Sequence, residues 1–165
     1  MDPVAERARA VRLAIFDVDG VMTDGTLYFG PQGEALKAFN IHDGHGLKML
    51  RASGVATAII SGRTSEAVAR RAAELGIAHV VQGSQDKSAA FDGLLSSLGL
   101  EARACSFMGD DLPDLPVMRR CGLAVAVADA HESVRSEAHY VTRAGGGRGA
   151  VREFCDLVLR AQARG

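Results

Sequence analysis

The sequence lacks a surplus of charge of either sign. It has 19 lysines and arginines against 20 aspartates and glutamates, which leaves a net charge of −1. The basic residues are scattered, and aromatic residues make up only 5% of the chain. A protein that binds nucleic acid or an anionic membrane surface typically carries a basic patch. We therefore expect neither of these partners.

Cysteine is scarce, and long apolar runs are missing. The three cysteines, Cys105, Cys121 and Cys155, are widely spaced and form no CxxC pair. This spacing favours neither a zinc site nor a disulfide framework, and free thiols are typical of a reducing compartment. No run approaches the ~20 apolar residues of a membrane span, and the charged segment 1–12 does not resemble a signal peptide. We expect a soluble, cytoplasmic protein.

The composition is otherwise that of an ordinary globular protein, and apolar runs alternate with helical patterns. The expected strands are 13–16, 55–60, 78–81, 104–108, 123–127 and 139–142, and the expected helices are 65–75, 86–98, 114–121 and 150–163. Most of the strand candidates are apolar throughout, which indicates strands that are buried on both faces. The sequence predicts an α/β fold of Rossmann-like type, with a central parallel sheet in a three-layer arrangement. Its 165 residues suit a single domain, 1–165.

Two segments depart from this alternation. Short β-prone runs on either side of 30-GPQGE-34 predict a hairpin at about 26–39, and Asp24 is expected to cap the turn that leads into it. In the C-terminal region of about 144–163, the run 145-GGGRG-149 could be a flexible joint before the last helix. It could also be a strip that closely approaches a ligand or a neighbouring subunit. The role of Arg148 stays open.

Polar and charged residues follow the predicted strands. Asp17 and Asp19 follow the first strand, Ser61 follows the second, and Lys87 begins the helix after the third. The acidic run 109-GDDLPD-114 follows the fourth. Ligands bind outside the carboxyl ends of the strands in sheets of this kind. We therefore expect these side chains to converge on one site.

Clustered carboxylates repel one another unless a cation neutralises them, and Mg²⁺ prefers oxygen ligands. Asp17 and Asp110 could each give one oxygen to the ion. A carboxylate beside Mg²⁺ and a lysine can attack phosphorus, and a second carboxylate two residues on can transfer protons. Ser61 and Lys87 can hold phosphoryl oxygens. The pattern predicts phosphoryl transfer with Mg²⁺ as cofactor.

The order of these motifs resembles the haloacid dehalogenase superfamily of aspartyl-phosphate phosphatases. The motifs are DxD after the first strand, a serine after the second, a lysine that leads a later helix, and GDDxxD after the fourth strand. The resemblance implies that Asp17 is the nucleophile and a metal ligand. It implies that Asp19 is the general acid and base, with its backbone carbonyl on the metal. It also makes Ser61 and Lys87 catalytic and Asp110 a metal ligand.

A narrower resemblance covers nearly the whole chain. The segments that carry it are DVDGVMTDG, FNIHDGHG, IISGR, QDKSAA, GDDLPDLPVM and GGGRGAVRE. Together they are similar to the 3-deoxy-D-manno-octulosonate (Kdo) 8-phosphate phosphatases, which act in lipopolysaccharide biosynthesis. Met22 replaces the usual leucine of this family, a swap that conserves volume. The resemblance implies a capless fold with a short hairpin, and a homotetramer whose sites are completed by neighbouring subunits.

The resemblance also implies a set of substrate-binding residues. These are Asp19, Asn40, Ile41, His42, Asp43, Gly44, Lys48, Arg63, Arg71 and Lys87. Arg63 could pair with the carboxylate of a keto-acid sugar, whereas Arg71 is either a second anion contact or part of a solvated helix face. We expect no metal at His42 and His45, because they lie in a predicted loop without a cysteine or a third histidine nearby. Asp43 and Thr64 are expected to cap the helices that follow them.

Several alternatives stay open. Asp111 and Asp114 could orient a metal-bound water or Lys87, and Asp114 could equally cap a helix. The substrate could be a nine-carbon keto-acid sugar phosphate. The chain could also be a non-catalytic domain that oligomerises, although the complete motif set favours an enzyme. A phospho-acceptor signalling domain is disfavoured, because Asp19 would hydrolyse a phosphoaspartate quickly.

Overall fold

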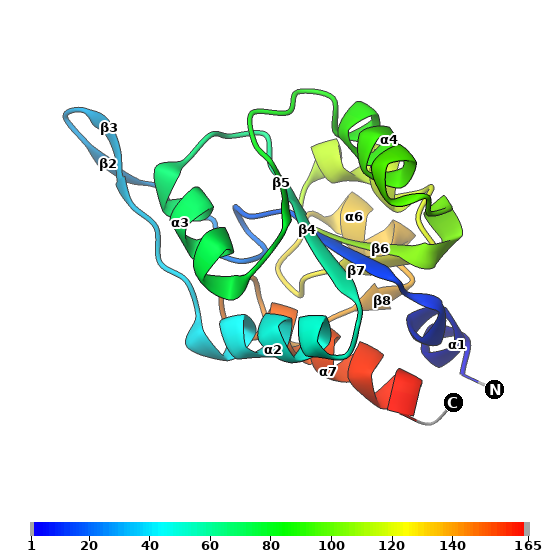
Figure 1. Ribbon diagram of the computed structural model, residues 1–165. Coiled ribbons are helices and arrows are strands. Elements are labelled where there is room, and N and C mark those ends of the chain that lie inside the picture. The colour runs from blue at the N-terminus through cyan, green and yellow to red at the C-terminus, as the bar shows by residue number, and fades with distance from the viewer. Residues whose placement is uncertain (1, 164–165) are drawn as a thin grey trace.

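A fully parallel six-stranded sheet forms the centre of the protein, in a computed structural model that describes residues 2–163 (Figure 1). The strands are β1 (Leu13–Phe16), β4 (Ala56–Ile60), β5 (His79–Val81), β6 (Cys105–Gly109), β7 (Leu123–Ala126) and β8 (Tyr140–Val141). Their order is β5–β4–β1–β6–β7–β8, so the chain extends the sheet from β1 in one direction and later in the other. The strand order therefore reverses between β1 and β6, and ligands of such sheets bind at this switch point.

Helices cover both faces of the sheet, which confirms the predicted three-layer α/β fold. They are α1 (Pro3–Ala10), α2 (Ile41–Ala52), α3 (Glu66–Leu75), α4 (Lys87–Leu98), α5 (Leu115–Met118), α6 (Glu132–Glu137) and α7 (Ala150–Ala163), with short 3₁₀ turns at Ala102–Ala104 and Leu112–Asp114. Helices α1, α2 and α7 pack together on one face, and α4 and α5 pack on the other (Figure 1). Within residues 2–163, no helix is both long enough and apolar enough to cross a membrane.

The predicted strands are found in place, and the inner strands are buried on both faces, whereas the edge strands β5 and β8 are partly exposed. All four residues of β1 are buried, and so are all four of β7. The ring of Phe16 packs edge-to-face on Phe154 of α7, with ring centroids 5.6 Å apart. One expected helix, 114–121, is shorter than predicted, since only Leu115–Met118 is α-helical. The short helices α1 and α6 were not expected from the sequence.

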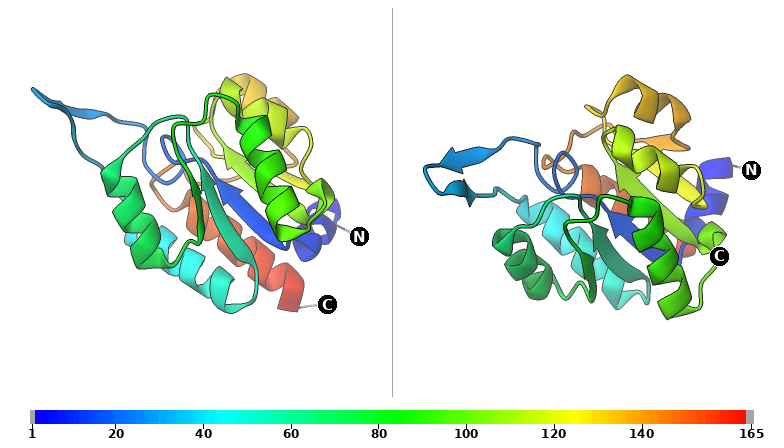
Figure 2. Two further views of the ribbon diagram at one scale, coloured as in Figure 1. Left: turned by 45° about the horizontal axis from the view of Figure 1, so that its top comes forward. Right: turned by 90° about the horizontal axis from the view of Figure 1, so that it is seen from above.

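The predicted hairpin is present and projects from the body of the protein (Figures 1 and 2). Its antiparallel strands are β2 (Tyr28–Gly30) and β3 (Gly33–Leu36). Asp24 caps the preceding turn as expected, because its Oδ1 accepts the backbone N–H of Thr26 at 2.9 Å. Apolar side chains on the hairpin are exposed, and Phe29 is 70% exposed. Phe39, in contrast, is half-buried and packs against the core.

Two expected helix caps are wrong by one and three residues. The N-cap of α3 is Ser65 instead of Thr64, and its Oγ accepts the N–H of Val68. The N-cap of α2 is Asn40, whose side-chain oxygen accepts two backbone N–H groups of the first turn. Asp43 therefore lies inside α2. The segment with His42 and His45 is helical rather than a loop.

Asp43 caps a different helix from the one expected. Its side chain is buried, and Oδ1 accepts the backbone N–H of Arg152 at 2.9 Å in the first turn of α7. Burial raises the pKa of this carboxyl group, and the hydrogen bonds from α7 partly offset the rise. Asp43 thus ties α2 to α7 across the face of the sheet. Sequence spacing could not show this contact because 109 residues separate the two partners.

Candidate active site

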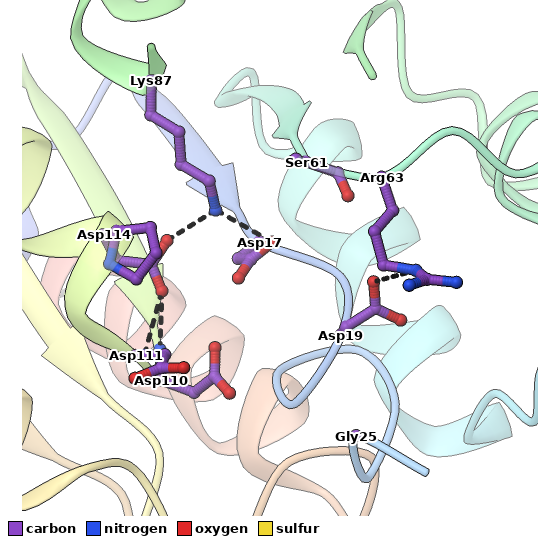
Figure 3. Close-up of a pocket in the computed structure, with 11 residues that line it drawn as sticks. Asp17, Asp19, Gly25, Ser61, Arg63, Lys87, Asp110, Asp111 and Asp114 are labelled. Carbon is purple, nitrogen blue, oxygen red and sulfur yellow. Dashed lines mark hydrogen bonds and ion pairs between the residues drawn. The ribbon is translucent and has the colours of Figure 1, made fainter. Parts of the chain in front are cut away.

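A pocket of about 360 Å³ lies at the carboxyl ends of β1, β4 and β6 (Figure 3). It is lined by Asp17, Asp19, Gly25, Ser61, Gly62, Arg63, Lys87, Asp110, Asp111, Pro113 and Asp114. These residues follow β1, β4 or β6, and Lys87 begins α4, which is where a parallel sheet places its ligand-binding residues. The fold therefore brings every predicted catalytic and metal-binding residue into one cavity.

Asp17 is the most enclosed carboxylate that the first strand delivers to this pocket. It is 8% exposed, and its Oδ1 accepts the N–H of Val18 at 2.7 Å. The ammonium of Lys87 lies 3.2 Å from the same oxygen. Burial and the charge of Asp114 outweigh the opposing charge of Lys87 and raise the pKa of Asp17 to about 7. The ion pair with Lys87 leaves Oδ2 of Asp17 for other partners.

Both carboxylate oxygens of Asp114 already accept hydrogen bonds within the protein. Its Oδ1 accepts a hydrogen bond from Lys87 at 2.7 Å, and its Oδ2 accepts the N–H groups of Asp110 and Asp111 at 2.9 and 3.2 Å. It makes no side-chain cap to α5, but it closes the capping box of the 3₁₀ turn Leu112–Asp114, and its contact with Lys87 is that of a residue that orients the ammonium. Burial lowers the pKa of Lys87, but the two neighbouring carboxylates outweigh this effect and raise it. Lys87 therefore stays an ammonium.

The donor set of the pocket fits a divalent cation with hard oxygen ligands. One oxygen each from Asp17, Asp110 and Asp114 lie within 4.8 Å of one another. Since Asp114 already accepts three hydrogen bonds, Asp17 and Asp110 are the pair with oxygens to offer. Burial, together with the charges of Asp17 and Asp114, raises the pKa of Asp110 to about 9. A cation would relieve this repulsion, and Mg²⁺ has the matching ligand preference.

Gly20 leaves the space that the carboxylate of Asp110 occupies. A Cβ atom on Gly20 would collide with Oδ2 of Asp110, and the φ of Gly20 is +85°. A side chain is disfavoured at this φ and would also displace a candidate metal ligand. The glycine after DxD thus has a reason in the geometry of the pocket.

Asp19 is held by a residue that the sequence pattern did not single out. The ammonium of Lys37 lies 2.6 Å from Oδ1 of Asp19 and 3.0 Å from Oε2 of Glu34. Arg63 lies farther away, 3.9 Å from Oδ2 of Asp19 (Figure 3). Lys37 follows β3 directly, and its side chain is only 3% exposed. The signal that could have found it is a pair of opposite charges three residues apart, in a hairpin expected at the ligand-binding edge.

The residues that the resemblance assigned to the sugar divide into two groups. Arg63 lines the pocket together with Asp19 and Lys87. The others, outside the lining, are Asn40, Ile41, His42, Asp43, Gly44, Lys48 and Arg71. Arg71 pairs with Glu74 at 2.8 Å, and its guanidinium lies 6.0 Å from the ring centroid of Phe39. The substrate roles of this second group stay predictions.

The glycine strip packs against the loop that follows β1. The N–H of Gly147 donates to the carbonyl of Val21 at 3.0 Å, and the N–H of Gly146 donates to Asp129. A Cβ atom on Gly146 would collide with the carbonyl of Gly20. The strip is therefore a close-packed support for the loop that carries Asp17 and Asp19. Arg148 beside it is exposed, with its guanidinium 3.7 Å from Asp24.

The parallel sheet and its acidic pocket define a haloacid dehalogenase-like hydrolase, and residues 76–151 match the family model of that description. A 3-deoxy-D-manno-octulosonate 8-phosphate phosphatase from Yersinia pestis is 53% identical over 161 residues, which cover 98% of this chain and 86% of the relative. The chain belongs to the 3-deoxy-D-manno-octulosonate 8-phosphate phosphatase family, which confirms the resemblance seen in the sequence.

Solved structures of this family superpose closely on the protein. The crystal structure of the Yersinia pestis phosphatase gives a TM-score of 0.96 and covers 99% of this chain and 88% of its own. The Moraxella catarrhalis phosphatase, in complex with magnesium, phosphate and Kdo, is 44% identical with a TM-score of 0.96, covering 99% and 94%. The cobalt-bound phosphatase from Haemophilus influenzae is 40% identical with a TM-score of 0.93, covering 95% and 92%.

Proposed function

We propose that this protein is a Mg²⁺-dependent phosphatase that hydrolyses Kdo 8-phosphate to Kdo and inorganic phosphate in lipopolysaccharide biosynthesis. The observation that carries the proposal is the buried Asp17, paired with Lys87 and crowded by Asp110, at the switch point of the sheet. The relatives that share half of its sequence are named for this eight-carbon substrate, which favours it over a nine-carbon sugar phosphate. The complete pocket favours an enzyme over a non-catalytic domain.

In the first step, a carboxylate oxygen of Asp17 forms a bond to phosphorus while the bond between phosphorus and the sugar oxygen breaks. Asp19 gives a proton to that leaving oxygen, so that the sugar departs as an alcohol. Lys87 and Ser61 donate hydrogen bonds to the phosphoryl oxygens and offset the charge that develops on them. Asp114 holds Lys87 in position for this task.

In the second step, a water oxygen forms a bond to phosphorus and the bond to Asp17 breaks. Asp19 takes a proton from this water, and inorganic phosphate leaves with Asp17 again a free carboxylate and Asp19 again carrying the proton that it gave up in the first step. Mg²⁺ would be held by Asp17, Asp110 and the backbone carbonyl of Asp19, and when bound it neutralises the carboxylates and the phosphoryl oxygens. Arg63, at the rim of the pocket, is suited to the carboxylate of the keto-acid sugar.

We further propose a homotetramer in which a neighbouring subunit completes each pocket. Leu27, Tyr28, Phe29 and Leu36 expose apolar surface on the projecting hairpin. A lone two-stranded hairpin is marginally stable in water, and its free strand edges invite pairing with another chain. Packing between hairpins of several subunits would bury these side chains and cover the pocket. We place the enzyme in the cytoplasm, since its three cysteines are free and buried.

The proposed function is tested by measuring phosphate release from Kdo 8-phosphate with the purified protein. We expect turnover with Mg²⁺, its loss in EDTA, and its return when excess Mg²⁺ is added. Absence of phosphate release at saturating Mg²⁺ would overturn the proposal. Turnover that persists in EDTA after exhaustive dialysis would show that the reaction does not require Mg²⁺.

A further inference from the structure

Lys37 occupies an unusual position for a lysine. Its side chain is 3% exposed, although lysine is almost never fully buried unless it is paired. Its ammonium is compensated on two sides, by Oδ1 of Asp19 at 2.6 Å and by Oε2 of Glu34 at 3.0 Å. Lys37 does not line the pocket itself. The pocket residue that it contacts directly is Asp19, which makes Asp19 the shortest route for an effect of Lys37 on the reaction.

The lysine is fixed to the body of the protein by a second chain of contacts. Oε1 of Glu34 accepts a hydrogen bond from Oγ of Ser65 at 2.7 Å, and Ser65 caps helix α3. Arg63 lies 3.7 Å from Oε2 of the same glutamate. Two carboxylates and two cations thus alternate in one cluster without net charge. This tether holds the ammonium of Lys37 in place before a ligand arrives.

The side chain of Asp19 depends on this ammonium for its orientation. Within residues 2–163, Lys37 is the one hydrogen-bond donor to the Asp19 carboxylate, because Arg63 at 3.9 Å is too far away. With Oδ1 held by Lys37, Oδ2 is the oxygen that remains for the pocket. We propose that Lys37 is a positioning residue that fixes which oxygen of Asp19 faces the phosphoryl group, and thereby sets the efficiency of proton transfer in both steps.

The inference rests on the phosphatase activity proposed above and concerns its two proton transfers. In the first, Asp19 protonates the sugar oxygen as its bond to phosphorus breaks. A p-nitrophenolate leaving group is stable as an anion and leaves without that proton. In the second, Asp19 accepts a proton from the attacking water, whichever ester supplied the phosphoryl group. Loss of positioning should therefore affect the two esters differently in the first turnover.

The test compares Lys37→Met with wild type on Kdo 8-phosphate and on p-nitrophenyl phosphate in rapid-mixing experiments. We expect the first turnover of the sugar phosphate to slow by roughly 100-fold, the lower range of general acid catalysis. We expect the first release of p-nitrophenolate to stay within about threefold of wild type and to appear as a burst before a slow steady state. An equal loss on both esters would overturn the positioning role.

A double-mutant cycle tests whether Lys37 acts through Asp19. Adding Lys37→Met to Asp19→Asn should lower sugar phosphate turnover by less than about twofold further, because the partner is already lost. A further loss of the full single-mutant factor would contradict the inference. Failure of the wild-type protein to turn over either ester would instead contradict the proposed function, so the two failures are distinguishable.

Two variants separate positioning from simple support of the hairpin. Ser65→Ala removes the tether between Glu34 and α3 but leaves the ion pair of Lys37 with Asp19. The variant should slow the first turnover of both esters by the same small factor. If it instead slows the sugar phosphate selectively, as Lys37→Met is expected to do, the effect comes from anchoring of the hairpin and not from positioning of Asp19. Arg103→Met removes an exposed cation far from the pocket and should match wild type. Sedimentation and thermal unfolding verify that all variants stay folded and assembled.

Discussion

At the scale of single residues, burial raises the pKa values of the carboxyl groups in the pocket. Asp17 is enclosed by the ends of the central strands, and Asp110 faces it from the neighbouring strand. Their pKa values rise to about 7 and about 9, first because of burial and then because of neighbouring negative charge. Without a cation, both groups therefore hold protons at pH values where free carboxylates are ionised. A cation must displace these protons.

Because Asp17 and Asp110 hold protons in the metal-free protein, we expect the affinity for Mg²⁺ to depend on pH. A raised pKa means that the metal-free folded protein keeps a proton that the bound ion excludes, so affinity should rise with pH. Between pH 7 and pH 9, where Asp110 is still protonated, we expect a gain of about tenfold per pH unit. Titration calorimetry in buffers of different ionisation enthalpy measures both the affinity and the protons released. Asp110→Ala should bind weakly without this slope, and a pH-independent wild-type affinity would contradict the account.

Asp17→Asn tests the nucleophile. The amide keeps the shape of the side chain but cannot form the phosphoryl ester, so turnover of Kdo 8-phosphate should fall below about 1% of wild type. The control is thermal unfolding, which should show a protein as stable as the parent, because the change relieves crowding with Asp110. A variant that retains more activity than this would remove Asp17 from the nucleophilic role.

The residues of the site differ in how readily the sequence predicts them. Asp17, Ser61 and Lys87 follow strands or begin a helix, so local pattern and parallel topology were enough to bring them together. Lys37 was missed because its partner is Asp19, and that contact depends on where the chain after β3 returns to the body of the protein. Asp43 was expected to cap its own helix, but it bonds to α7 across 109 residues. Contacts of this kind are set by tertiary packing, so the spacing of residues along the sequence does not predict them.

At the scale of elements, the loop after β1 is shaped by what lies against it. The glycine strip supports this loop from one side, and the carboxylate of Asp110 fills the space above Gly20. Both approaches require backbone without a side chain. The loop can therefore carry Asp17 and Asp19 in a fixed relation only while these glycines are present.

Gly20→Ala tests this dependence. The added methyl group meets Oδ2 of Asp110 at a φ of +85°, so we expect a loss of stability of about 1–3 kcal/mol and a weaker Mg²⁺ affinity. Denaturant unfolding and calorimetry measure the two effects. Gly93→Ala is the matched control, because its Cβ would meet no atom within 4 Å inside α4. That variant should be as stable as wild type or more stable by up to about 1 kcal/mol, and equal behaviour of the two variants would contradict the role of Gly20.

Elements with strong local signals were predicted well, and weaker ones were not. The buried strands stand out because short, continuously apolar runs between turn residues are typical of strands that are covered on both faces. Helix α1 was missed, although Asp2 followed by Pro3 is a start signal, and here Asp2 accepts the N–H of Val4 at 3.0 Å. Cap positions were misjudged because Thr64 and Ser65 are adjacent and equally suited. Ser65 is the cap in the structure, and its hydroxyl also donates to Glu34 of the hairpin, a tertiary contact that the sequence does not reveal.

At the scale of the whole molecule, the hairpin leaves apolar surface without a partner inside the chain. Leu27 and Leu36 are 46% and 52% exposed, and Phe29 is 70% exposed. Phe39, which follows the hairpin, does not belong to this surface because it packs against the core. The remaining side chains form a patch that a second copy of the chain could cover.

Substitution of this patch tests the proposed tetramer. Replacing Leu27 and Phe29 together with aspartate should dissociate the assembly, since buried like charges would face one another across the interface. Analytical ultracentrifugation measures the mass, and Phe29→Leu, which keeps the patch apolar, should stay assembled. We expect the dissociated form to keep some cleavage of simple phosphate esters and to lose selectivity for the sugar phosphate. A wild-type protein that is monomeric and fully active at assay concentration would refute the assembly.

The most direct test of the central claim is a comparison of kcat/KM across phosphate esters. The panel contains Kdo 8-phosphate, a nine-carbon keto-acid sugar phosphate and p-nitrophenyl phosphate, each measured with Mg²⁺ and with EDTA. A pocket that couples Asp17 chemistry to recognition of an eight-carbon keto acid predicts the highest value for Kdo 8-phosphate. We expect a margin of at least about 100-fold over p-nitrophenyl phosphate, and no turnover in EDTA. Equal values for all three esters, or a preference for the nine-carbon sugar, would contradict the account.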